Sequence, residues 1–90
     1  MNDKTRQAIE NFVEFTPNSI NAPISHCTDR NRIFDIAIAA FESQEALSDV
    51  YNELNSQIHE HHFLHEKDLI VSLKRDITLI VEFLKYQQHR

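Results

Sequence analysis

The longest apolar-periodic run in the chain extends from residue 68 to residue 86, DLIVSLKRDITLIVEFLKY. Apolar residues recur there every three or four positions, which places them on one side of an α-helix. The main row is Ile70, Leu73, Ile77, Ile80 and Leu84, and a second row that widens it is Leu69, Leu79, Phe83 and Tyr86. We expect this helix to be the central one of a small bundle, with Val71 and Val81 left at its surface.

Three shorter segments have the same helical period. Their apolar faces are Ala8, Ile9, Phe12 and Val13, then Ile33, Phe34, Ala37, Ile38 and Phe41, then Leu47, Val50, Tyr51, Leu54 and Ile58. Asp3 is expected to cap the first of these helices, and Ser43 is expected to start the third. The periodicity also allows 30–62 to be one bent helix, but a straight helix over 30–60 would be about 46 Å long, which favours a corner near Ser43. The predicted elements are helices 4–15, 30–42, 44–62 and 66–88, with a loop over 16–29.

Composition favours an all-helical fold. The 90-residue chain has no glycine and two prolines, so it lacks most of the residues that form tight turns and hairpins. This length suffices for one domain with a single hydrophobic core. The sequence therefore predicts one all-α domain over residues 1–90, a small bundle of four helices without a sheet, in which the third and fourth helices are the longest.

Cysteine content and hydropathy indicate the compartment. The single cysteine, Cys27, excludes an internal disulfide and is typical of a reducing environment. No apolar run approaches the roughly 20 residues that a membrane span needs, and the N-terminus has no signal-peptide core. We expect a cytoplasmic protein that does not bind a membrane.

Charge is distributed unevenly along the chain. The net charge is −5, and no Lys or Arg occurs between Ile33 and Glu66. The spacing of Glu42, Glu45, Asp49 and Glu53 would put them on one ridge of a continuous helix. Such a field repels nucleic acid and attracts basic proteins, whereas the alternative is a solvated outer face. The residues predicted to bind a basic partner are Asp35, Glu42, Glu45, Asp49, Tyr51 and Glu53.

The segment HEHHFLHE, residues 59–66, holds four of the six histidines. It does not match HExxH, because Phe63 occupies the position of the second histidine. On a continuing helix, His65 would share a side with His61 or with His62, which offers two imidazoles to one metal ion. Two ligands do not make a site, so we expect no bound metal and interpret the cluster as a solvated corner between helices.

No catalytic signature is present. The chain cannot form a glycine-rich phosphate loop, and no serine has the context of a nucleophile elbow, so we expect neither an enzyme nor a cofactor. In size, helicity and acidity the chain resembles the small immunity proteins and antitoxins that bacteria make against basic nuclease toxins. The leading hypothesis is such an inhibitor, which binds a basic protein and not nucleic acid. The alternatives are a helical subunit that self-associates through its last helix, forming a homodimer, and a histidine-based metal- or pH-responsive module.

Overall fold

The computed structural model describes residues 1–15 and 30–88. They form four helices, α1 (Asp3–Phe15), α2 (Arg30–Glu42), α3 (Leu47–Glu60) and α4 (Glu66–Gln88). These two stretches contain no strand, which confirms the predicted all-α fold. α3 has 14 residues and α4 has 23, against 13 in α1 and in α2, so the last two are the longest, as predicted. The predicted loop over 16–29, with Cys27, lies outside the described residues.

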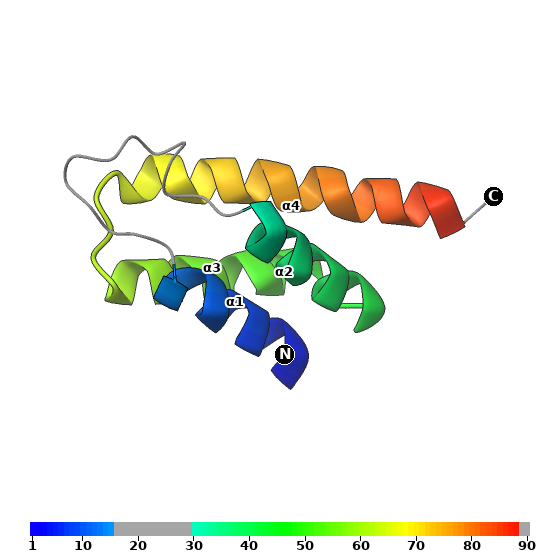
Figure 1. Ribbon diagram of the computed structural model, residues 1–90, viewed down its shortest axis with the longest axis horizontal. Coiled ribbons are helices and arrows are strands. Elements are labelled where there is room, and N and C mark those ends of the chain that lie inside the picture. Colours follow the sequence, from blue (N-terminus) through cyan, green and yellow to red (C-terminus); the bar gives the residue numbers. More distant parts are fainter. Residues whose placement is uncertain (16–29, 89–90) are drawn as a thin grey trace.

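The helices surround one core. α2 and α3 each pack against both α1 and α4, so α1 and α4 occupy opposite corners of the bundle, as do α2 and α3. Figure 1 shows α4 along one edge of the molecule and α1 at the opposite edge. The prediction that the last helix is central is therefore wrong, because α4, like α1, packs closely against α2 and α3 alone among the described helices. One face of α4 consequently points away from the rest of the protein.

The buried face of α4 consists of Leu69, Leu73, Ile77 and Val81. Leu73 and Ile77 were predicted correctly, but Val81, which was expected at the surface, is buried. The buried residues are spaced every four positions and follow one ridge of the helix, as they do when helices cross at an angle. Residues four apart do not lie exactly above one another, so the buried side of the helix turns gradually along its length. Of the second predicted row, only Leu69 lies on this buried side. Its remaining members, Leu79, Phe83 and Tyr86, are exposed.

The first helix begins one residue earlier than predicted. The side-chain oxygen of Asn2 accepts a hydrogen bond from the backbone amide of Lys4 at 2.8 Å, and its carbonyl accepts from the amide of Arg6 at 3.1 Å. This is the geometry of an N-cap residue, so Asn2 and not Asp3 is the cap. Asp3 instead lies in the first turn, where its negative charge favours the positive end of the helix dipole.

The predicted corner between the second and third helices is present, but Ser43 does not start α3. The amide of Gln44 donates to the carbonyl of Phe41 at 3.2 Å, and the amide of Glu45 donates to the carbonyl of Ala40 at 2.9 Å. These two bonds form a Schellman motif, which ends α2 and holds Gln44 in the left-handed region at φ 55°. The predicted start at residue 44 is therefore too early, and α3 begins at Leu47.

A polar contact fixes α3 against α4. The Tyr51 hydroxyl contacts the hydroxyl of Thr78 and lies 3.4 Å from the carbonyl oxygen of Lys74. The ammonium of Lys74 lies 5.6 Å from the centre of the Tyr51 ring, within the range of a cation–π interaction. Tyr51 thus serves the packing of the bundle.

Replacing Thr5 by Val is expected to raise the free energy of unfolding by about 1 kcal/mol. Thr5 is fully buried, and its hydroxyl has no hydrogen-bond partner among the described residues. An unsatisfied buried hydroxyl costs about 1–3 kcal/mol, and Val has the same shape without that cost. Urea denaturation would measure the change.

The matched control is Thr78→Val, which removes a hydroxyl that does have a partner, Tyr51. That variant should lose stability. A loss of stability in Thr5→Val as well would show that the Thr5 hydroxyl is hydrogen bonded.

Candidate functional site

A groove with a volume of about 500 Å³ runs between α1 and α3. Glu10 and Glu14 line its α1 side, and they are four residues apart, so they share one side of the helix. The α3 side is formed by residues at the same kind of spacing, namely Glu53, Ser56, Gln57, Glu60 and His61. We call this the α1–α3 groove. Four of its seven lining residues are glutamates, so it is the feature that a positively charged ligand would fit.

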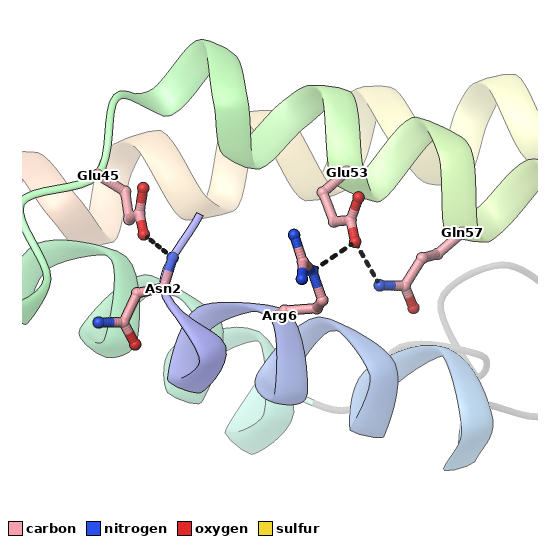
Figure 2. Close-up of polar contacts among 5 residues, drawn as sticks. All are labelled: Asn2, Arg6, Glu45, Glu53 and Gln57. Atoms are coloured by element: carbon pink, nitrogen blue, oxygen red, sulfur yellow. Dashed lines mark hydrogen bonds and ion pairs between the residues drawn. The ribbon is translucent and has the colours of Figure 1, made fainter.

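Arginine is already held at one end of the α1–α3 groove. The Arg6 Nε atom lies 3.3 Å from the Glu53 Oε1 atom, and the Gln57 side-chain amide donates to the same oxygen at 3.2 Å (Figure 2). The Arg6 side chain is 47% exposed, so the pair contributes at most about 1 kcal/mol to stability. The contact shows that a guanidinium between the two helices reaches a carboxylate of the groove.

The remaining groove carboxylates give it a strong negative charge. Glu10, Glu14 and Glu60 are exposed, and Arg6 is paired with Glu53. The Nδ1 atom of His61, at the same end as Glu60, lies 3.1 Å from the carbonyl oxygen of Gln57. A groove lined by carboxylates at the rim of a low-dielectric core concentrates the negative potential, which attracts cationic side chains and repels phosphate.

The acidic residues singled out in the sequence do not form one ridge. Asp35 and Glu42 lie on α2 and line a different depression, which Lys4 and Arg32 also line, so the charges are mixed there. Asp49 and Glu53 lie on α3. Glu45 sits in the corner between them and accepts a hydrogen bond from the backbone amide of Asn2 (Figure 2). The corner at 43–46 breaks the continuous helix that a ridge requires.

Only Glu53 of the predicted partner-binding residues lines the α1–α3 groove. Asp49 lies one turn before Glu53 and is exposed on the same side of α3. Tyr51 points toward α4 and does not belong to this surface. Sequence reasoning missed Glu10, Glu14 and Glu60, although the four-residue spacing of the first two was visible. The missing information was that α1 packs beside α3.

The four histidines of the segment 59–66 lie at the corner between α3 and α4. α3 ends at Glu60, and both His62 and His65 have left-handed backbone conformations, with φ of 52° and 57°. The helix that would align the pairs His61–His65 and His62–His65 is therefore interrupted. His59 contacts Glu66 across the corner, with 3.2 Å between Nδ1 and Oε1. Within residues 1–15 and 30–88, no three His, Cys, Asp or Glu side chains are grouped as a metal site requires.

None of the four helices is long and apolar enough to cross a membrane. Comparisons of the chain with protein-family models, curated proteins and solved structures give no match.

Proposed function

We propose that the protein is a non-enzymatic binding protein that holds a basic protein partner against the α1–α3 groove. The observation that carries the proposal is the concentration of four glutamates in one groove, where a guanidinium of the chain itself already contacts Glu53. A partner's Arg or Lys side chains would bind Glu10, Glu14 and Glu60 in the same way. Charge-assisted hydrogen bonds of this kind are about twice as strong as neutral ones.

The kind of partner that fits best is a nuclease or another nucleic-acid-binding protein. Such proteins bind phosphates through clustered Arg and Lys side chains. A row of carboxylates competes for the same cations, so its binding would mask the surface that nucleic acid needs. We therefore propose an inhibitor of the immunity or antitoxin type, acting by steric and electrostatic masking and not by chemistry.

The test uses, as the candidate partner, the protein encoded by the gene adjacent to the gene of this protein. An equimolar amount of the inhibitor should abolish its cleavage of plasmid DNA at low salt, and raising the salt should weaken the complex because surface charges are screened. Serum albumin, which is also acidic, serves as the control for non-specific charge. The proposal fails if the neighbouring protein is not basic, or if it is inhibited equally by albumin.

A further inference from the structure

The outer face of α4 carries large apolar side chains that nothing in the described part of the chain covers. Val71, Leu79, Phe83 and Tyr86 are 65%, 59%, 56% and 68% exposed. Their spacing of eight, four and three residues places them on one side of the helix, opposite the buried residues Leu73 and Ile77. We call these four residues the α4 stripe. Large exposed apolar side chains gathered on one side of a helix are typical of a binding site for another protein.

Charge favours a second copy of the same chain as the occupant. α4 contains four acidic residues, Glu66, Asp68, Asp76 and Glu82, and four basic residues, Lys67, Lys74, Arg75 and Lys85. The helix is therefore neutral, and the net charge of −5 comes from the rest of the chain. Two copies of an acidic protein repel each other, and this repulsion is smallest if they approach through their neutral helices.

The order of residues on this face is self-complementary in the antiparallel direction. Arg75 and Glu82 lie equally far on either side of the point between Thr78 and Leu79, and so do Val71 and Tyr86. A two-fold axis at that point would put Arg75 opposite Glu82 of the second copy. The same axis would put Val71 opposite Tyr86 of the second copy and bring the two Leu79 side chains together. A two-fold interface requires this kind of reciprocal pairing.

We propose that the protein forms a two-fold symmetric dimer through antiparallel packing of the α4 stripe, centred next to Leu79. Arg75 is available for the new ion pair, because its side chain is 67% exposed and its present partner is the adjacent Asp76, with 3.5 Å between Nε and Oδ1. Phe83 lies one turn beyond Leu79 and would cover the aliphatic part of Arg75 of the second copy.

The small area of the interface is typical of a weak, reversible dimer. A helix of 23 residues is about 34 Å long and about 10 Å wide, so one face of it offers less than the roughly 800 Å² per partner of a standard stable interface. The dimer should therefore be concentration-dependent, with a dissociation constant in the micromolar range. The proposal is independent of the proposed function, since none of the residues that line the α1–α3 groove lies on α4, and the groove stays open.

Sedimentation measurements over a range from low micromolar to millimolar protein test the dimer. The wild-type protein should change from monomer to dimer over this range. Leu79→Glu puts two carboxylates together at the two-fold axis and should lower the association constant at least about a hundredfold. The matched control is Leu64→Glu, the same substitution at an exposed leucine in the α3–α4 corner, which should leave dimerisation unchanged. A wild-type protein that stays monomeric, or a dimer that tolerates Leu79→Glu, overturns the proposal.

The pairing of Arg75 with Glu82 has its own test, in case Leu79→Glu impairs folding. Arg75→Glu and Glu82→Arg should each weaken dimerisation about tenfold, because each creates two like-charge contacts across the axis. Mixing the two variants should restore it in a heterodimer, and the double variant should restore it in a homodimer. Failure of the mixture to associate better than either variant alone would contradict this register.

Discussion

Replacing Leu73 or Ile77 by Ala is expected to lower the free energy of unfolding by about 2–5 kcal/mol. Both side chains are fully buried at the middle of α4, where the helix packs against α2 and α3. Each truncation removes apolar contacts and leaves a cavity that a four-helix core fills only partly. Because the free energy of unfolding of such domains is about 5–15 kcal/mol, either substitution would remove a large part of the stability. Urea denaturation followed by circular dichroism would measure the loss.

The control for this prediction is Leu79→Ala, the same truncation at a leucine of α4 that is 59% exposed. At protein concentrations too low for dimerisation, that variant should change stability by less than about 0.5 kcal/mol. Equal losses at Leu73 and Leu79 would contradict the assignment of the buried and exposed faces of α4, and with it the α4 stripe.

Reversing Glu14 and Glu60 together to Lys is expected to slow the association of a basic partner by at least about tenfold at low salt. Both side chains are exposed on the α1–α3 groove, one on each helix, so the variant should fold normally. Glu53 is left intact because it pairs with Arg6. Stopped-flow mixing with a dye-labelled arginine-rich peptide would give the association rate and its dependence on salt, which should also become weaker.

The matched control is Asp35→Lys with Glu42→Lys. These two residues are exposed on α2, outside the groove, and their reversal changes the net charge by the same amount. If association slows equally in both double variants, its rate depends only on the net charge of the protein and not on the α1–α3 groove. A larger effect in the α2 variant would instead place the binding surface at Asp35 and Glu42, two of the residues singled out from the sequence.

The periodicity of apolar residues was sufficient to predict the four helices. It located 30–42 and 66–88 correctly, because apolar spacing reports directly on which positions can face a core. The start of α3 was misjudged because Gln44 adopts a left-handed conformation that glycine usually marks, and the chain has no glycine. The buried face of α4 was predicted only in part. Which of its apolar residues are buried depends on the angle at which α4 crosses its neighbours, and the sequence of one helix does not determine that angle.

The candidate site could be predicted less well than the fold. The absence of Lys and Arg between Ile33 and Glu66 suggested an unpaired acidic ridge, yet Glu53 is paired with Arg6 of the first helix. The α1–α3 groove combines glutamates from two helices that are far apart along the chain. Its existence depends on which helices become neighbours, and local sequence patterns do not specify that choice.

The most direct test of the proposed binding surface is chemical-shift mapping by heteronuclear NMR with the arginine-rich peptide as ligand. The largest shifts at low salt are expected at the amides of Glu10, Glu14, Ser56 and Glu60, and they should disappear as the salt rises to about 0.5 M. Amides on the outer face of α4 should stay unchanged. Shifts spread evenly over all acidic residues, or concentrated on α2 or α4, would contradict the α1–α3 groove as the docking site.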